Sequence, residues 1–392
     1  MSGAKGFPDD VVIVGGGFSG LSIAALLAGH GIPVTLLEAA DLGFEASTRN
    51  QGWLHSGAWF APRQVDIARM CYESWRKTVH FCPSCLEPGH TGMLFVVTDP
   101  DTDVARWTSA WEQAEIPYQQ LSTERAAELL PDMDRSSFQT AFQLPDRSIR
   151  PHALLRHLAD QATAHGARIH TNSRVTKLVR DDGRITSVVT SNGDEVKTSF
   201  VVVATGASQA DLSHYLVTDN SCTQSLFSRV TLQTHLVAVD PQLCHQPFCL
   251  VDCDGFNHMP HWNRDDRTAS VFGIDHWKVV NSLESAHSLD AEVSLIQDRV
   301  RRFFPQAQLS DQTMRSWSGT TVQAMHVEQI DPGQVPLPTV IDHAKESPCV
   351  ENLLSVYPGR ATLWTHLAED AYATIVRRLE PSRSLTARPP WA

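Results

Sequence analysis

The sequence predicts an α/β fold in which a parallel sheet and a β-meander are joined to an inserted domain with an antiparallel sheet. Three observations predict it. Residues 11–38 form a strand, a glycine-rich turn, a helix and a second strand; residues 174–203 read as successive strands separated by tight turns; and two long insertions lack this alternation. The chain therefore combines two architectures.

The composition narrows the class of protein. The chain has 392 residues, of which 42% are apolar and 19% charged, and its formal net charge is −12. The apolar content supports a large core, and the negative charge argues against nucleic acid or an anionic membrane as the main partner. No apolar run approaches the roughly 18 residues of a membrane-spanning helix, and residues 1–10 lack the apolar region of a secretory signal. We expect a soluble, cytoplasmic protein.

The eight cysteines are expected to be reduced thiols in such a protein. Cys82 and Cys85 form a Cys-x-x-Cys pair near Cys71, His80 and His90, which together would offer ligands to zinc. No second pair follows at the spacing of a zinc ribbon. We therefore predict no bound metal and expect these thiols to pack in or near a core.

The β-α-β unit is the clearest local pattern. Val11–Val14 is a β-branched run typical of a strand buried on both faces. A Gly-Gly-Gly-Phe-Ser-Gly turn follows at residues 15–20, and an Ala- and Leu-rich helix is expected over residues 21–30. Val34–Leu37 is the second strand, and Glu38 ends it.

The glycines of this turn have distinct expected tasks. Gly15 permits a tight turn out of the strand, Gly17 lets the backbone approach a pyrophosphate, and Gly20 lets the helix pack closely on the sheet. The N–H groups at the helix start, including those of Phe18 and Ser19, would face the phosphates. The unit therefore predicts a Rossmann-like dinucleotide site.

An acidic residue completes the motif. Glu38 stands at the end of the second strand, where its carboxylate can accept a hydrogen bond from a ribose hydroxyl, and Ala39 follows it at the same edge. The strand, helix, second strand and acid agree with one another. This agreement makes the motif more specific than an isolated glycine pattern.

A second group of elements begins near residue 150. Pro151 is a favourable first residue for a helix over 151–165. Strands are expected at 174–180, 185–190 and 196–203, because Asp-Gly and Asn-Gly dipeptides separate them. The last strand leads into Ala204-Thr205-Gly206. Near the chain's end, a strand at 353–356 and a helix over 362–379 flank Pro358-Gly359, and residues 383–392 are expected to form a loose tail.

The order of these elements favours FAD over NAD as the dinucleotide. At this point the sequence resembles the D-amino-acid-oxidase-like family of FAD-dependent oxidoreductases, which includes glycine and sarcosine oxidases, glycerol-3-phosphate dehydrogenase and L-2-hydroxyglutarate dehydrogenase. The resemblance covers nearly the whole chain and is specific in five segments: 11–38, 47–57, 150–179, 201–207 and 358–370. The second and last are most similar to the glycerol-phosphate and hydroxy-acid branch.

The resemblance implies a discontinuous FAD-binding domain made of residues 1–60, 141–215 and 336–392. Residues 61–140 and 216–335 would form the substrate domain. In these insertions we expect helices at 65–81, 102–115 and 123–130, and strands at 230–239 and 270–274.

Further cofactor contacts follow from the resemblance alone. The loop after the second strand would lie along the pyrophosphate and the flavin, Val175 would contact the adenine, and residues 204–206 would pass close to the dinucleotide. Residues 359–362, at a helix start, would donate to the O2 side of the flavin. The implied residues are Ser47, Thr48, Arg49, Asn50, Gln51, Gly52, Val175, Ala204, Thr205, Gly206, Gly359, Arg360, Ala361 and Thr362.

Three residues are candidates for catalysis. His55 would lie beside the isoalloxazine as a base or a polar contact, although a buried histidine bonded to the backbone is the alternative. His258, or its neighbour His261, would face the substrate from a strand over the flavin. Arg360 would add a fixed positive charge, unless it is a solvated residue at the helix start.

The walls of the substrate pocket are less specific. Trp53, Trp59 and Phe60 would line the pocket or pack in the core. In the related branch an arginine holds the substrate's anionic group, but the matching segment here, 317–322, contains none. Arg315 or Arg264 would have to replace it, because a buried anion needs a paired cation.

The expected reaction is the oxidation of a C–H bond next to nitrogen or oxygen in a small molecule, with hydride transfer to flavin N5 and reoxidation by O₂ or another acceptor. An amine or amino-acid oxidase and an alcohol or hydroxy-acid dehydrogenase both remain open. An NADPH-dependent flavin monooxygenase is disfavoured because no second glycine motif is found. A flavin-binding protein without catalysis is the remaining alternative.

Overall fold

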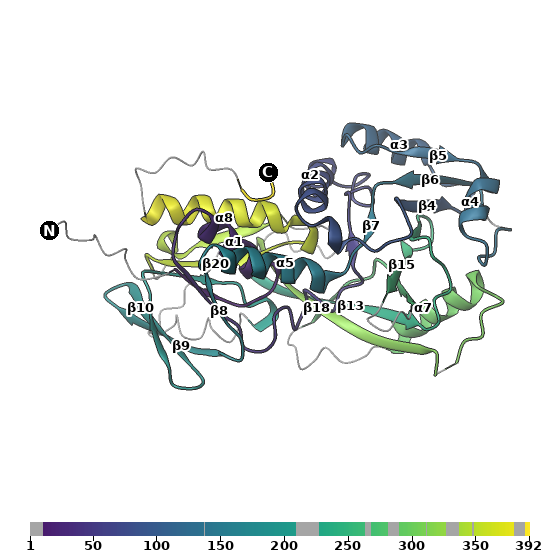
Figure 1. The fold of residues 1–392 in the computed structure, drawn as a ribbon. Coiled ribbons are helices and arrows are strands. Elements are labelled where there is room, and N and C mark those ends of the chain that lie inside the picture. The colour runs from purple at the N-terminus through teal and green to yellow at the C-terminus, as the bar shows by residue number, and fades with distance from the viewer. Residues whose placement is uncertain are drawn as a thin grey trace.

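Two large β-sheets lie side by side in the computed structural model of the chain (Figure 1). The structure describes residues 11–136, 138–208, 227–262, 268–280, 290–310, 312–326, 337–346, 349–379 and 389–392. Arg264 and Cys222 lie outside these residues. The predicted combination of a Rossmann-like unit, a meander and an antiparallel sheet is confirmed.

The first sheet has six strands in the order β19-β20-β12-β1-β2-β8. All neighbouring strands are parallel except β19, which is antiparallel to β20. β8 and β19 were not predicted from the sequence. The strands are β1 (Val11–Val14), β2 (Val34–Leu37), β8 (Arg168–His170), β12 (Phe200–Val203), β19 (Thr339–Asp342) and β20 (Leu353–Tyr357).

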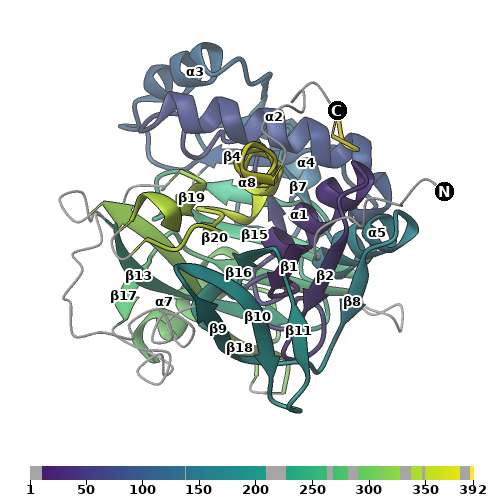
Figure 2. The same cartoon turned by 90° about the vertical axis from the view of Figure 1, so that its left-hand side faces the viewer.

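Both faces of this sheet are covered, which explains its apolar strands. On one face Val11 and Ile13 pack with helices α1 (Phe18–Gly29), α5 (Pro151–Ala164) and α8 (Trp364–Leu379). On the other, Val12 and Val14 pack against a small sheet of β9 (Val175–Asp181), β10 (Arg184–Thr190) and β11 (Glu195–Lys197) (Figure 2). A strand that is buried on both faces favours apolar residues at successive positions.

The third strand of the predicted meander divides between two sheets. β11 pairs with β10, whereas β12 pairs with β1 in the six-stranded sheet. The break falls at Thr198, whose hydroxyl donates to the main-chain oxygen of Phe200 at 2.7 Å and accepts from its N–H at 3.2 Å. This local turn replaces ladder hydrogen bonds, so the continuous strand expected over 196–203 does not form.

The second sheet has nine strands in the order β17-β13-β16-β15-β14-β4-β6-β5, with β18 paired to β13. Helices α2 (Val65–Phe81) and α3 (Val104–Gln113) cover one face, and α4 (Thr123–Leu129) and α7 (Asp290–Phe303) the other. Most of these strands, and α7, were not predicted. The strands are β4 (Met93–Val97), β5 (Gln119–Leu121), β6 (Thr140–Leu144), β13 (Phe227–Val239), β14 (Phe248–Leu250), β15 (Phe256–Trp262), β16 (Thr268–Gly273), β17 (Lys278–Val280) and β18 (Met314–His326).

Two long strands connect the sheets. β13 and β18 pair antiparallel over 13 residues each, and in Figure 1 they run from the second sheet toward the first. Near the end of β18, Val322 and Ala324 pack with Ile341 of β19 and Tyr357 of β20. The space between the sheets is thus bounded by residues from both.

The division into two domains remains a proposal. β6, which the predicted boundary at residue 141 divides, pairs with β4 in the nine-stranded sheet. The chain's last residues depart from the expected loose tail, because Trp391 is buried and its indole N–H donates to Glu369 at 2.8 Å. Within the described part of the chain, no helix has the length and apolarity needed to cross a membrane.

Asn352 fastens the meander to the six-stranded sheet. Its buried amide donates to the main-chain oxygens of Ile185 and Ser199 at 2.7 and 3.0 Å and accepts from the Ile185 N–H at 2.8 Å. Replacing Asn352 with alanine removes all three of these hydrogen bonds from a buried position. We expect the free energy of unfolding to fall by about 3 kcal/mol, measured by urea denaturation.

The neighbouring exposed residue is the matched control. Glu351 forms an ion pair with Arg184 at the surface, so Glu351→Ala is expected to cost less than about 1 kcal/mol. Equal losses in the two variants would show that Asn352 does not join the layers.

Candidate active site

Two adjoining cavities form an elongated cleft between the sheets, with volumes of about 190 and 220 Å³. The aromatic cavity is lined by His55, Trp59, Phe60, Trp277 and Arg360, among others. The glycine cavity is lined by residues 15–17, Glu38, Val175 and residues 204–206, among others. The cavities share Phe18, Ser19, Ala46, Ser47, Thr321 and Pro358.

The glycine turn after β1 leaves no room for side chains. Gly15 has φ +113°, and a Cβ added there would lie 2.5 Å from the carbonyl oxygen of Ala204. A Cβ on Gly20 would lie 1.9 Å from the carbonyl oxygen of Gly15. The helix and the neighbouring strand therefore approach the turn as closely as the sequence pattern predicts. Gly20 packs the helix but does not line either cavity.

Glu38 is fixed by the same turn. Its carboxylate accepts from the N–H of Gly16 at 2.6 Å and from the N–H of Ala40 at 2.8 Å. The side chain lines the glycine cavity beside Ala39 and Val175. A carboxylate held in this way presents its remaining acceptor capacity to the cavity.

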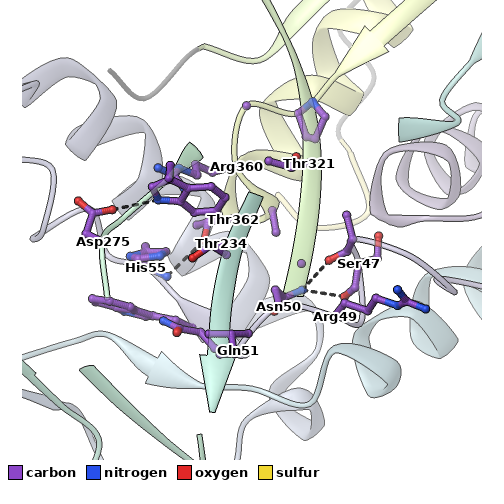
Figure 3. Close-up of a pocket in the computed structure, with 18 of the residues that line it drawn as sticks. Ser47, Arg49, Asn50, Gln51, His55, Thr234, Asp275, Thr321, Arg360 and Thr362 are labelled. Atoms are coloured by element: carbon purple, nitrogen blue, oxygen red, sulfur yellow. Dashed lines mark hydrogen bonds between the residues drawn. The ribbon is translucent and has the colours of Figure 1, made fainter. Parts of the chain in front are cut away.

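The loop after α1 and β2 connects the two cavities. The hydroxyl of Ser47 accepts from the Phe18 N–H at 3.0 Å, and the amide of Asn50 donates to Ser47 at 2.9 Å (Figure 3). Arg49 and Gln51 also line the aromatic cavity. Figure 3 places Ser47, Arg49 and Asn50 at one end of this cavity and His55 and Arg360 at the other.

Two predicted cofactor residues in this loop line neither cavity. The hydroxyl of Thr48 donates to the carbonyl of Gly43 at 2.6 Å. Gly52 has φ +71°, and a Cβ there would lie 2.5 Å from the ring of His261. In the structure these residues hold the loop in place.

His55 lines the aromatic cavity, and its place beside a flavin stays a prediction. Its ring stacks on Trp53 with a centroid separation of 4.1 Å and lies 5.0 Å from Phe60, and its main-chain N–H donates to the Thr362 hydroxyl at 3.2 Å. Among the described residues its buried Nδ1 has no hydrogen-bond partner. Burial, with a smaller effect of Arg360, holds the pKa of His55 well below its usual value. The imidazole is therefore neutral at neutral pH.

Asp146 supports His55 indirectly and was not predicted from the sequence. Its buried carboxylate accepts from the Trp53 indole N–H at 2.7 Å and from the N–H and hydroxyl of Ser56. Burial raises the pKa of Asp146 to about 6, although these hydrogen bonds oppose the shift. A single aspartate in a loop gives no sequence signal for this role.

Arg360 lies between two aromatic rings. Its guanidinium carbon is 4.5 Å from the centroid of Trp277 and 5.4 Å from that of Phe60. Within the described residues no carboxylate lies within ion-pair distance of it, and its buried Nε has no hydrogen-bond partner. Burial lowers the pKa of Arg360, and Asp275 opposes that effect. Because guanidinium groups stay protonated in proteins, the cavity contains a cation stabilised mainly by π-faces.

Asp275, whose charge acts on Arg360, already accepts hydrogen bonds from other side chains. It accepts from the indole N–H groups of Trp59 at 2.8 Å and Trp277 at 3.1 Å, and from Arg63 at 3.0 Å. These contacts fix the aromatic wall on which Arg360 lies. Neither Asp275 nor Trp277 belongs to a segment that the sequence patterns singled out.

The segment before α8, whose contact with the flavin stays a prediction, lines the aromatic cavity. Gly359 has φ +69°, and its carbonyl accepts from the buried amide of Gln323 on β18 at 2.8 Å. The carbonyl of Thr362 accepts from Ser74 of α2. These contacts anchor residues 359–362, which all line the aromatic cavity.

His258 does not reach either cavity, which corrects the role expected for it. The ring is fully buried within the nine-stranded sheet, and its nitrogens lie 3.1 Å from the Gln246 carbonyl and 2.8 Å from the Ser270 hydroxyl. Burial lowers its pKa to about 3. His261 instead contacts the Gln51 carbonyl at 2.7 Å and Glu87 at 3.3 Å, so it positions the loop.

The segment that matches the family's substrate-binding arginine contributes uncharged residues to the aromatic cavity. Gly319, Thr320 and Thr321 of β18 line the aromatic cavity without a charge. Arg315 is exposed and lines neither cavity, so it does not replace the missing group. Asn257, which was not predicted, lines the cavity with a buried Oδ1 that has no partner among the described residues, since its Nδ2 donates to Gly255.

The residues of the cleft fit FAD. The glycine cavity has a tightly packed turn at the start of a helix, which suits a pyrophosphate. It also has a carboxylate held by hydrogen bonds, which suits a ribose. The aromatic cavity supplies three buried polar atoms that lack protein partners in the described chain: His55 Nδ1, Asn257 Oδ1 and Arg360 Nε. Buried polar atoms of this kind indicate a polar ligand.

Comparisons with known proteins agree with this fit. A model of the DAO family, described as FAD dependent oxidoreductase, matches residues 10–345. One subunit of the anaerobic glycerol-3-phosphate dehydrogenase of Haloferax volcanii is 33% identical over 213 residues, covering 50% of this chain and 36% of that protein. Its counterpart from Escherichia coli is 33% identical over 186 residues, covering 47% and 34%. The matched region thus spans about a third of these relatives.

Solved structures share the fold over nearly the whole chain. Glycine oxidase from Geobacillus kaustophilus has a TM-score of 0.71 at 19% identity, covering 98% of this chain and 97% of its own. Glycerol-3-phosphate dehydrogenase from Bacillus halodurans, complexed with FAD, has a TM-score of 0.68 at 14% identity, covering 97% and 67%. The glycine turn, the cleft and the family match together show that this chain belongs to the DAO family of FAD-dependent oxidoreductases.

Proposed function

We propose that this chain oxidises a small molecule at a C–H bond next to a hydroxyl group, and that His55 accepts the hydroxyl proton. FAD would supply the hydride acceptor at N5, and O₂ or another acceptor would take up the electrons. One observation carries the proposal: the aromatic cavity holds a neutral imidazole with a free nitrogen beside a cation without a carboxylate partner among the described residues.

A base is needed because an unactivated hydroxyl is a very weak acid. His55 can act as one, since burial keeps its imidazole neutral and its Nδ1 is not occupied by another described group. Trp53 and Thr362 fix the ring and main chain of His55, and Asp146 in turn fixes Trp53. A base held by such contacts needs little reorganisation to accept a proton.

Arg360 supplies positive charge at the same end of the cleft. Its guanidinium contacts the rings of Phe60 and Trp277. A fixed cation stabilises negative charge that develops during a reaction, and it does so best where water is excluded. We assign this role to Arg360 toward the reduced cofactor, which becomes anionic.

The dinucleotide would lie along the remainder of the cleft. The turn at residues 15–17 and the first N–H groups of α1 would hold the pyrophosphate, and Glu38 the ribose. Val175 and residues 204–206 would enclose the adenosine half. Ser47, Asn50 and Gln51 would lie along the cofactor toward the aromatic cavity.

Glu38→Ala should weaken FAD binding without blocking turnover of fully loaded protein. The substitution removes a charged acceptor and also releases the N–H of Gly16, so the dissociation constant should rise by about 10- to 100-fold, measured by flavin titration. Asp41→Ala, which removes an exposed carboxylate nearby, is the control. If both variants bind FAD as the unaltered protein does, the ribose assignment fails.

The substrate class is tested by anaerobic mixing of the FAD-loaded protein with three panels of reductant. At least one alcohol of the first panel, which includes hydroxy acids, should bleach the flavin band, whereas NADPH should not. Bleaching by amines or amino acids alone would make the protein an amine oxidase. Bleaching by NADPH alone would indicate a monooxygenase, and no bleaching by any panel would indicate a flavin-binding protein without this chemistry.

His55→Ala should slow flavin reduction by an alcohol by roughly 10²- to 10⁴-fold, the usual contribution of general-base catalysis. FAD occupancy should stay near normal, because the glycine cavity is unchanged. Stopped-flow reduction and occupancy are measured on the same sample, with His152→Ala, an exposed histidine, as control.

The pH profile gives an independent test of the same role. Since the pKa of His55 is lowered, its basic form is complete at neutral pH, and reduction should rise with pH only below neutrality and then level off. A continued alkaline rise, with a small effect of His55→Ala, would instead report the proton of an amine substrate. Loss of FAD from the variant would show that His55 is structural.

A further inference from the structure

Cys82 and Cys85 occupy the two ends of one tight turn, and neither lines the two cavities of the cleft. Cys82 caps the C-terminus of α2, and Pro83–Cys85 form a single 3₁₀ turn. The N–H of Cys85 donates to the carbonyl of Cys82 at 3.0 Å. Such a turn brings the two Cα atoms within about 7 Å and places side chains three residues apart on one side. Disulfides need Cα separations of about 4.4–6.8 Å.

The turn is held in this geometry from outside. Arg150 donates its main-chain N–H to the Cys85 carbonyl at 2.7 Å and its guanidinium to the Ser84 carbonyl at 2.5 Å. Both thiols are buried in the core cluster that also contains residues of α1 and α5, whereas Pro83 and Ser84 between them are exposed. The thiols thus lie beneath two exposed residues, in a turn whose Cα spacing is compatible with a disulfide.

A metal ion does not account for the pair. In the part of the chain that the structure describes, no group of three or more histidine, cysteine or acidic side chains could hold one. Zinc sites use four ligands when structural and three when catalytic. Two thiols with no third ligand are better suited to forming a bond with each other.

The two sulfurs differ in reactivity. The neighbouring Cys85 thiol, with smaller effects of Ser84 and His157, holds the pKa of Cys82 below its usual value. The same pairing and burial raise the pKa of Cys85. Cys71, a single buried thiol nearby in sequence, has its pKa raised to about 12 by burial. A thiolate is the nucleophilic form, so Cys82 is suited to attack and Cys85 to resolve.

We propose that Cys82 and Cys85 are a redox-active dithiol, which hydrogen peroxide converts into a disulfide within the turn. The Cys82 thiolate attacks one peroxide oxygen; the S–O bond forms, the O–O bond breaks, and the leaving hydroxide takes a proton to become water. The Cys85 sulfur then attacks Cys82; the S–S bond forms, the S–O bond breaks, and the thiol proton leaves with the hydroxide as a second water. Two thiols lose two electrons and one peroxide gains them.

The test uses the FAD-loaded full chain, because its tryptic peptides separate the relevant thiols. Cleavage after Lys77 and Arg106 releases residues 78–106, whose two cysteines are Cys82 and Cys85. The reduced protein is exposed to a small excess of hydrogen peroxide, denatured in N-ethylmaleimide, digested and weighed by mass spectrometry. We expect this peptide to lose two hydrogens and to carry no maleimide group. If the disulfide is reduced with dithiothreitol before alkylation, the peptide should carry two maleimide groups.

The peptide of residues 70–76 is the internal control, since it holds Cys71 alone. It should keep its maleimide group throughout. A peptide 78–106 that stays doubly alkylated after peroxide would overturn the proposal. So would its conversion to sulfinic or sulfonic acid without pairing.

Serine variants assign the two roles. In Cys85→Ser, Cys82 has no resolving partner and should accumulate a sulfenic acid that dimedone traps. In Cys82→Ser, Cys85 should give no dimedone adduct, and Cys71→Ser should form the disulfide as the unaltered protein does. An adduct on Cys85 but none on Cys82 would contradict the proposed order. Should a serine variant fail to retain FAD, the peptide measurement on the unaltered chain still decides whether the disulfide forms.

Discussion

The close packing of the glycine turn at residues 15–20 against β12 and α1 is the constraint on which the rest of the cleft depends. Gly15 faces the carbonyl of Ala204, and Gly20 faces the carbonyl of Gly15, at distances that exclude any Cβ. This packing sets β1, β12 and α1 around one point. The freed N–H groups of the turn then bind side chains from other segments: that of Gly16 binds Glu38, and that of Phe18 binds Ser47. Because Ser47 begins the loop that leads to His55, the turn also fixes where the aromatic cavity can form.

The opposite wall is fixed by a different kind of interaction. β13 and β18 pair without interruption over their whole lengths, which makes a stiff ribbon between the two sheets. Gln323, which belongs to this ribbon, donates a hydrogen bond to the carbonyl of Gly359. Ser74, which belongs to α2, donates one to the carbonyl of Thr362. Arg360 is thereby held between elements of both sheets. His55 joins the same arrangement through its N–H to the Thr362 hydroxyl, so two residues far apart in sequence share one support.

Sequence patterns predicted those residues of the candidate site whose type is required by the local backbone geometry. The turn at residues 15–20 and Glu38 could be predicted because each needs a particular residue type at a particular backbone position. The aromatic cavity could not be predicted in the same way. His55 and His258 both stand in segments expected near the flavin, yet one has a free nitrogen and the other is bonded to Gln246 and Ser270. Residues distant in sequence decide which histidine nitrogen is left without a partner. The roles of Asp146 and Asp275 likewise depend on residues distant in sequence. The single strand expected over 196–203 failed for a local reason, the side-chain turn at Thr198.

The charges of the aromatic cavity show why its two candidate groups can differ in role. Among the described residues, two carboxylates near the cavity are engaged: Asp146 by Trp53 and Ser56, and Asp275 by two indoles and Arg63. Neither is therefore placed to neutralise Arg360 directly or to take a proton in place of His55. Arg360 in turn lowers the pKa of His55, because a nearby cation disfavours a second positive charge. One residue keeps its charge and the other stays neutral. A site with this asymmetry can accept a proton and stabilise a developing anion at the same time, which neither an acidic nor a doubly cationic cavity could do.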